Sequence, residues 1–165
     1  MRNLRAKGFT LIELILVAGI FGIFAVGIMA VANPSQQVLK ANDGRRKADL
    51  TQIQRGLEGY YQDNGRYPQA TSNKISTPAV IEWGASWQPY MNVLPKDPHS
   101  PRTYVYYVSS DGQSYLLYAS LERGTVDPQA CNGGAACTSL STYGIAATAC
   151  GGTCNYAVAS ADINP

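Results

Sequence analysis

The most apolar segment of the chain is a run of nineteen residues, 14–32, that contains no charged side chain. At about 1.5 Å per residue, a helix of this length reaches across the hydrocarbon core of a bilayer. The first eight residues include three basic side chains, Arg2, Arg5 and Lys7, and no acidic one. Because such basic residues stay on the cytoplasmic side, we expect the rest of the chain to be translocated.

A second periodic segment, residues 35–64, is polar but carries a repeating apolar position. The steps of three and four between its apolar residues place them on one face of a helix: Leu50, Ile53, Leu57, Tyr60 and Tyr61. Pro34 predicts a kink or break before this helix, and Gly65 predicts its end. The segment therefore reads as an amphipathic helix with one face against a core.

The next regular segments are short and favour β-structure. Residues 104–108 and 115–121 are rich in Tyr, Val and Leu, which are common in strands. The intervening residues 109–112 contain the Asp-Gly pair that is typical of a hairpin turn. We expect an antiparallel hairpin here.

The cysteines gather near the C-terminus, at Cys131, Cys137, Cys150 and Cys154. An even number on the translocated, oxidising side predicts two disulfides, and the spacing leaves all three pairings open. A zinc site fits less well, because C-x5-C and C-x3-C differ from the usual C-x2-C spacing. Gly, Ala, Ser and Thr dominate residues 130–161, a composition that suits an exposed surface.

Together these elements predict an α+β fold. The expected elements are a long N-terminal α-helix, first transmembrane and then amphipathic, a small antiparallel β-sheet and a disulfide-bearing C-terminal region. The expected divisions are a membrane helix at 9–34, an amphipathic helix at 35–64 and a globular β-sheet domain with a cysteine-rich loop at 65–165.

Composition and charge argue against catalysis and nucleic-acid binding. The net charge is only +2, and the basic run 45–47 has Asp43 and Asp49 beside it, which indicates a solvated helix face. The single histidine, His99, leaves little basis for His-dependent chemistry. The sequence contains no P-loop, G-x-S-x-G, H-E-x-x-H or G-x-G-x-x-G motif. We therefore expect no catalytic residue, metal, cofactor or nucleic-acid partner.

The apolar run allows three interpretations: a secretory signal cut after Ala-Val-Ala at 30–32, a permanent anchor, or a segment cut in front of its apolar part, after Gly8. The run exceeds the ~7–15 apolar residues of ordinary secretory signals. Glu13 adds a penalty, because a carboxylate near the centre of a membrane helix costs about 2.5–3.5 kcal/mol. A new α-amino group at Phe9 of a neighbouring chain would offset that penalty.

Residues 7–13, Lys-Gly-Phe-Thr-Leu-Ile-Glu, resemble the class III signal of type IV pilins and type II secretion pseudopilins. The resemblance implies that residues 1–8 are a prepilin leader peptide, that prepilin peptidase cuts after Gly8, and that Phe9 is then methylated. It also implies that Glu13 pairs with the N-terminal amine of a neighbouring subunit and sets the register of assembly.

Two later segments, 60–68 and 94–98, resemble major pseudopilins, and beyond Glu122 the resemblance ends. Major pseudopilins typically have an acidic, calcium-binding loop there, whereas this chain offers only Glu122, Asp127 and Asp162. Calcium takes about six to eight oxygen ligands, so we expect no metal site. The cysteine-bearing tail is instead similar to the cysteine-closed loop of many type IV pilins.

The preferred interpretation is a structural subunit of a type IV pilus-like filament, processed by prepilin peptidase and polymerised through its N-terminal helix. The missing calcium loop favours it over a first alternative, a type II secretion major pseudopilin that drives protein export. A second alternative is a membrane-anchored extracytoplasmic binding module. The expected partners are further copies of the chain, prepilin peptidase, the inner-membrane assembly platform and the membrane. The chain is expected in the inner (cytoplasmic) membrane first, then in a periplasmic or extracellular filament.

Overall fold

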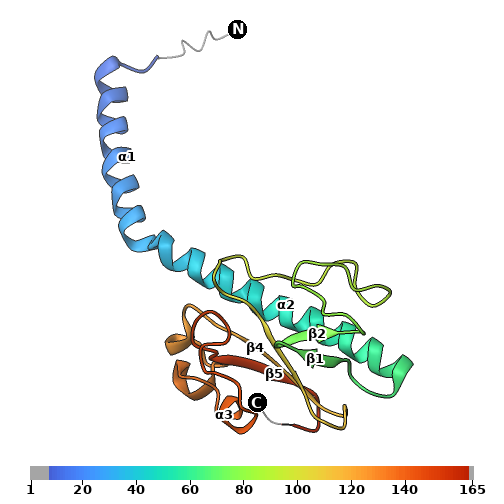
Figure 1. The fold of residues 1–165 in the computed structure, drawn as a ribbon. Helices are drawn as coiled ribbons and strands as arrows, with labels where there is room; N and C mark the ends of the chain where they lie inside the picture. Colours follow the sequence, from blue (N-terminus) through green and yellow to red (C-terminus); the bar gives the residue numbers. More distant parts are fainter. Residues whose placement is uncertain (1–7, 164–165) are drawn as a thin grey trace. The chain divides into compact units, whose positions relative to one another are not determined.

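The computed structural model describes the backbone of residues 8–163, with side chains for all of these except 29–32 (Figure 1). It confirms the predicted α+β fold, with long helices at the N-terminus and short antiparallel strands after them. The elements are α1 (Leu11–Ala32), α2 (Pro34–Asn64), β1 (Gln69–Thr71), β2 (Lys74–Ser76), β3 (Val105–Val108), β4 (Tyr115–Ala119), η1 (Gly124–Val126), η2 (Cys131–Gly134), α3 (Ser139–Thr142) and β5 (Tyr156–Ala159).

The predicted break between the two long helices is present at a single residue. Asn33 adopts a left-handed backbone conformation, φ 39° and ψ 69°, and so ends α1. Pro34 then opens α2, where its missing N–H and fixed φ suit the first helical position. The chain forms two compact units that divide between Val38 and Leu39, and each is described separately below.

The second unit is built on a three-stranded antiparallel sheet in the order β3-β4-β5. The predicted hairpin is its β3-β4 pair, with Val105 opposite Tyr118. Gly112 of the predicted turn has φ +71°, a conformation that glycine adopts without strain. The sequence analysis did not find β5, or the small β1-β2 hairpin that precedes the sheet.

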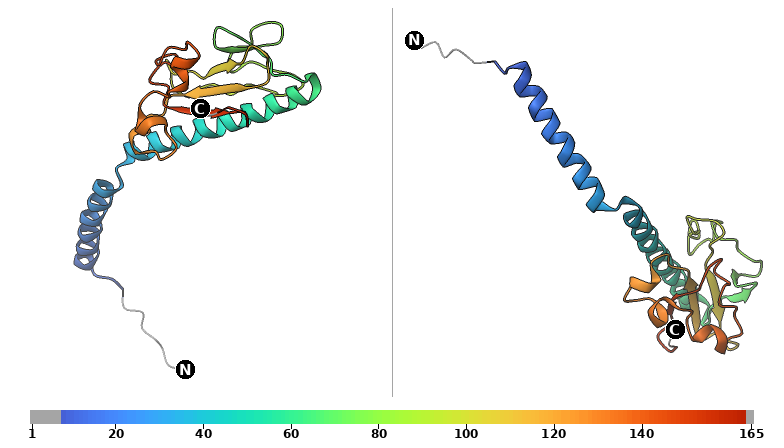
Figure 2. Two further views of the ribbon diagram at one scale, coloured as in Figure 1. Left: turned by 90° about the horizontal axis from the view of Figure 1, so that it is seen from below. Right: turned by 90° about the vertical axis from the view of Figure 1, so that its left-hand side faces the viewer.

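One face of the sheet packs against α2, and the two lie side by side in both views of Figure 2. The predicted apolar face of the helix supplies Leu50, Ile53 and Leu57, all with no exposed surface. They join a core whose sheet residues include Tyr106, Tyr115, Leu117, Ala119 and Tyr156. Burying these side chains is the main favourable term in forming the unit.

The opposite face of the sheet is covered by the cysteine-bearing segment. Its disulfides join near neighbours, Cys131 to Cys137 and Cys150 to Cys154, which resolves the open pairing. The expectation that this segment forms an exposed surface was wrong in part. Several of its side chains are buried against Val105, Leu116 and Tyr118, and they include Cys137, Leu140, Cys150 and Cys154. All five residues of β4 are buried because both faces of the sheet are covered.

The buried tyrosines lead to a prediction at alkaline pH. Burial raises the pKa of Tyr67, Tyr104, Tyr106 and Tyr115, and the hydrogen bond from Tyr104 to Asp49 adds to it. A raised pKa in the folded state means that the stabilisation is complete below the ordinary value of about 10 and is lost as the pH rises above it.

We therefore expect the unit to unfold above about pH 10, because these phenols ionise only when exposed. Absorbance at the tyrosinate band and near-ultraviolet circular dichroism, followed through the same titration, should change together for the buried tyrosines. Full tyrosinate absorbance with the circular dichroism intact would contradict the burial.

Candidate functional site

The peptide bond between Gly8 and Phe9 lies before α1, in exposed residues outside regular secondary structure. Phe9 is 82 % exposed, and no other atom lies within 4 Å of the position that a Cβ would take at Gly8. The three basic leader residues, Arg2, Arg5 and Lys7, lie outside the described residues. An enzyme could reach the Gly8–Phe9 bond without unfolding any described element.

Glu13 sits in the first turn of α1, where it takes part in capping the helix. The Thr10 hydroxyl accepts a hydrogen bond from the Glu13 N–H at 3.3 Å, and Thr10 is the N-cap. This is one half of the capping box that a Thr-x-x-Glu sequence can form. Among the described residues, no cation lies within 4.0 Å of the Glu13 carboxylate. The side chain is exposed, so it is available to a charged partner from outside the chain.

The rest of α1 is apolar on every side, and its span Leu11–Ile28 is not buried against any other described residue. Residues Leu11–Ile28 form a span long and apolar enough to cross a membrane, and none of it is buried. Examples are Phe21 at 69 % and Ile23 at 77 % exposed. A helix that is apolar all round is normally buried in a membrane or in a large core. The geometry thus supports both membrane insertion and helix–helix association.

The second unit contains a buried ion cluster, which we call the Arg46 cluster: Arg46, Asp43, Asp97 and Glu122. The Arg46 guanidinium has no exposed surface and donates to Asp97 at 2.7 Å and 3.1 Å, to Asp43 at 2.9 Å and to Glu122 at 2.9 Å. The sequence interpretation of this helix face as solvated was therefore wrong at Asp43 and Arg46. Both face inward, because carboxylates from distant loops neutralise the guanidinium.

The Arg46 cluster joins three parts of the chain. Asp43 also accepts the backbone N–H groups of Glu122 and Arg123, each at 2.8 Å. Burial lowers the pKa of Arg46, but the hydrogen bonds to Asp97 and Glu122 outweigh it and raise that pKa above its ordinary value. The Arg46 guanidinium therefore stays protonated, and its hydrogen bonds fix α2 to the loops that carry Asp97 and Glu122. The only local sequence sign of the Arg46 cluster is the Asp-x-x-Arg spacing of Asp43 and Arg46.

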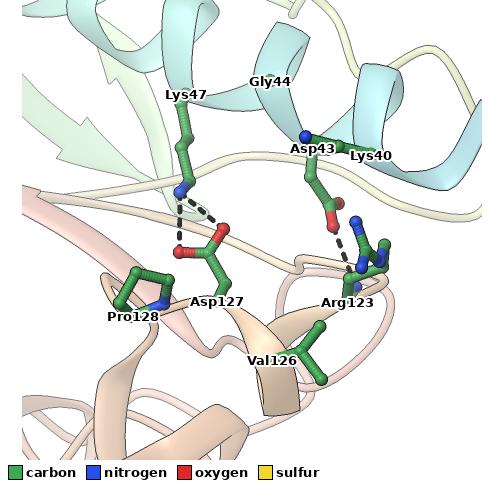
Figure 3. Close-up of a pocket in the computed structure, with 8 residues that line it drawn as sticks. All are labelled: Lys40, Asp43, Gly44, Lys47, Arg123, Val126, Asp127 and Pro128. Atoms are coloured by element: carbon green, nitrogen blue, oxygen red, sulfur yellow. Dashed lines mark hydrogen bonds and ion pairs between the residues drawn. The ribbon is translucent and has the colours of Figure 1, made fainter. Parts of the chain in front are cut away.

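The carboxylates considered as calcium ligands are largely used in other contacts. Lys47 Nζ donates to both oxygens of Asp127, at 2.6 Å and 2.7 Å, and to Gln129 Oε1 at 2.9 Å (Figure 3). Glu122 is paired with Arg46 and Arg102. In the part of the chain that the structure describes, no group of three or more His, Cys, Asp and Glu side chains could hold a metal ion. The donor set around Asp127 does not fit calcium.

Comparison with protein families gives two matches. Residues 33–129 match the family described as "Type II secretion system (T2SS), protein G", and residues 3–29 match the prokaryotic N-terminal methylation motif. The first match ends just before Cys131, so the disulfide-bearing segment lies beyond it. No solved structure matches the chain significantly.

Curated relatives carry one name, type II secretion system core protein G. The relative from Klebsiella michiganensis is 33 % identical, over 77 % of this chain and 83 % of its own. The relative from Aeromonas hydrophila is 31 % identical, over 59 % of this chain and 71 % of its own. The relative from Klebsiella pneumoniae is 29 % identical, over 74 % of this chain and 81 % of its own.

The Arg46 cluster predicts a large effect of one substitution and a small effect of its neighbour. Arg46→Met leaves the buried Asp43 and Asp97 without their cation, while Glu122 keeps Arg102, and should destabilise the unit by about 3–5 kcal/mol. Arg45→Met is the matched control, since the Arg45 side chain is 63 % exposed and lies 4.0 Å from Asp49. It should cost less than about 1 kcal/mol.

The measurement is urea unfolding of the full chain in mild detergent, followed by tyrosine and tryptophan fluorescence. Equal midpoints for the two variants would show that the Arg46 cluster does not hold the unit together.

Proposed function

The chain belongs to the type II secretion system protein G family, and from this we propose that it is a major pseudopilin, a structural subunit that polymerises through α1 into a periplasmic filament. The observation that carries the proposal is the family match over residues 33–129, together with a helix whose apolar span, Leu11–Ile28, is not buried by any described residue. In this proposal the filament drives protein export, and the subunit performs no catalysis.

The family match favours the pseudopilin over the surface pilus that the sequence analysis preferred. That preference depended on a missing calcium loop and on the cysteine-bearing tail. The tail covers the second face of the sheet, so it stabilises the subunit whatever filament the subunit forms. Asp127 lies in the region after Glu122 where the calcium loop was sought, and it is paired there with Lys47 of α2. Neither feature therefore argues for an extracellular pilus.

Processing by prepilin peptidase is the first proposed step. The enzyme would cut after Gly8 and leave Phe9 as a methylated N-terminus, in line with the methylation motif over residues 3–29. The exposure of Phe9 and the open space beside Gly8 support access by a protease. Until assembly, the mature chain would wait in the inner membrane, held by α1.

Assembly is the second proposed step, and Glu13 would direct it. Glu13 is the one charged side chain in the span Leu11–Ile28. Moving α1 from the bilayer to the filament axis keeps its apolar surface buried but leaves the Glu13 carboxylate in apolar surroundings. A neighbouring N-terminal amine would neutralise it, and only one axial offset brings the two groups together. The proposed partners are therefore further copies, prepilin peptidase and the inner-membrane assembly platform.

Deletion of the gene from its own host tests the filament's purpose. We expect enzymes that are normally exported to accumulate in the periplasm, while surface pili and twitching motility stay normal. Plasmid-borne expression of the chain should restore export. Normal export together with lost surface pili would support the pilus instead. A chain that keeps residues 1–8 and stays monomeric in mild detergent would support an anchored binding module.

Glu13 offers a test that separates its charge from its place in the helix cap. Glu13→Gln keeps a residue that can serve in a capping box but removes the charge. Since losing one partner of a buried ion pair costs about 3–5 kcal/mol, filament yield should fall roughly a hundredfold or more. Filaments are counted by electron microscopy after overexpression in the host.

The matched control is Thr10→Ala, which removes the cap acceptor and leaves the charge. It should cost about 1 kcal/mol in helix stability and leave most filaments in place. Mass analysis should show both variants cut after Gly8. Normal filaments in Glu13→Gln, with loss in Thr10→Ala, would show that capping is the role of this turn.

A further inference from the structure

A pocket of about 370 Å³ lies between the beginning of α2 and η1 in the second unit (Figure 3). Its lining is mostly charged, with one exposed apolar side chain, Val126, which is 65 % exposed. The lining residues are Lys40, Asp43, Gly44, Lys47, Arg123, Val126, Asp127 and Pro128. Three of these are cations and two are carboxylates, so the pocket has an excess of positive charge.

The two carboxylates of the pocket are already used by partners within the chain. Asp43 accepts hydrogen bonds from Arg46 and from the backbone N–H groups of Glu122 and Arg123. Each carboxylate oxygen of Asp127 accepts a hydrogen bond from Lys47 Nζ. Among the described residues, neither carboxylate forms an ion pair within 4.0 Å with the remaining two cations, although Arg123 interacts electrostatically with Asp127.

Those two cations, Lys40 and Arg123, stand beside Asp43 on the same side of the pocket in Figure 3. Across the described residues, neither has a carboxylate oxygen within 4.0 Å. The Nε of Arg123 is buried and has no hydrogen-bond partner. Two like charges at one pocket, one with an unused buried donor, are the arrangement that binds an external anion.

A matching anion occurs at the other end of the same helix. Asp63 is exposed in the last turn of α2, and no cation of the described chain lies within 4.0 Å of it. From Lys40 to Asp63 the helix rises about 35 Å, at 1.5 Å per residue. A second copy displaced along the helix axis by about this length would bring its Asp63 to the pocket.

We propose that the Lys40–Arg123 pocket binds the Asp63 carboxylate of a second copy of this chain. The contact joins two different surfaces, so it is head-to-tail, and repeated contacts of this kind build open helical filaments rather than closed pairs. Arginine and carboxylate suit one another because the guanidinium can donate two parallel hydrogen bonds. The inference rests on the proposed function and adds a second contact, outside α1, that sets subunit spacing.

The test is disulfide cross-linking of the full chain in its own host. Every native cysteine among the described residues is already paired. A chain carrying Ala41→Cys and Gln62→Cys, each next to one of the proposed contacts, should give a ladder of cross-linked multimers. Ala41→Cys alone should give none beyond dimers. Lys40→Glu with Arg123→Glu, or Asp63→Lys alone, should weaken the ladder about tenfold, because each brings like charges together.

Combining Lys40→Glu and Arg123→Glu with Asp63→Lys should restore the ladder, because the pocket and its partner again carry opposite charges. Arg55→Glu, an exposed cation outside the pocket, is the matched control and should leave the ladder unchanged. If Lys40→Glu with Arg123→Glu unfolds the unit, the neutral variant Lys40→Gln with Arg123→Gln tests the same contact.

The outcomes separate the inference from the function on which it depends. Wild-type filaments with a ladder that no charge variant alters would overturn the pocket contact alone. Rescue of the Lys40→Glu, Arg123→Glu variant by Asp162→Lys in place of Asp63→Lys would also overturn it, because Asp162 is another exposed carboxylate of this unit with no described cation within 4.0 Å. Absence of wild-type filaments would overturn the proposed function, and this contact with it.

Discussion

An apolar helix that no other described part of the chain buries is the constraint from which the rest of this molecule follows. None of the span Leu11–Ile28 is buried, and its side chains are apolar all round. Such a surface is stable only in a membrane or among other helices, because water solvates it poorly. The filament subunit proposed above would pass from one such environment to another, and the single acidic side chain of the span, Glu13, lies exposed in its first turn.

The second unit is stabilised by packing and ion pairs among its own residues. Both faces of the three-stranded sheet are covered, one by α2 and the other by the disulfide-bearing segment. The fully buried Arg46 then fixes α2 to two loops through three carboxylates. Buried ion pairs add little net stability compared with apolar packing, but they allow few alternative arrangements. A subunit that must repeat identically along a filament benefits from that uniqueness.

The disulfide-bearing segment changes how the chain compares with its family. The match to protein G of the type II secretion system stops at residue 129, before Cys131. In this chain the region that follows is a second layer over the sheet, with Cys150 and Cys154 fully buried. Just before that region, Lys47 forms an ion pair with Asp127. Covalent links and an ammonium group therefore stabilise the part of the fold where a cation-binding loop was sought.

Local patterns were sufficient for the features that depend on neighbours in the chain. The apolar run, the break at Asn33 and Pro34, the amphipathic face of α2 and the Asp-Gly hairpin all follow from residues within one or two turns of each other. The cysteine count predicted two disulfides but left their pairing open. The family resemblance also came from short motifs, at residues 7–13 and 60–68.

Features that join distant segments became visible only in the folded chain. Arg46 looked like a surface charge because its partners Asp97 and Glu122 are 51 and 76 residues away. Strand β5 has a weak pattern of its own and exists through pairing with β4. The Lys40–Arg123 pocket likewise combines residues of α2 with residues in and beside η1. Whether a charge is neutralised, and whether a strand has an edge to join, depends on three-dimensional neighbours that periodicity along the chain does not encode.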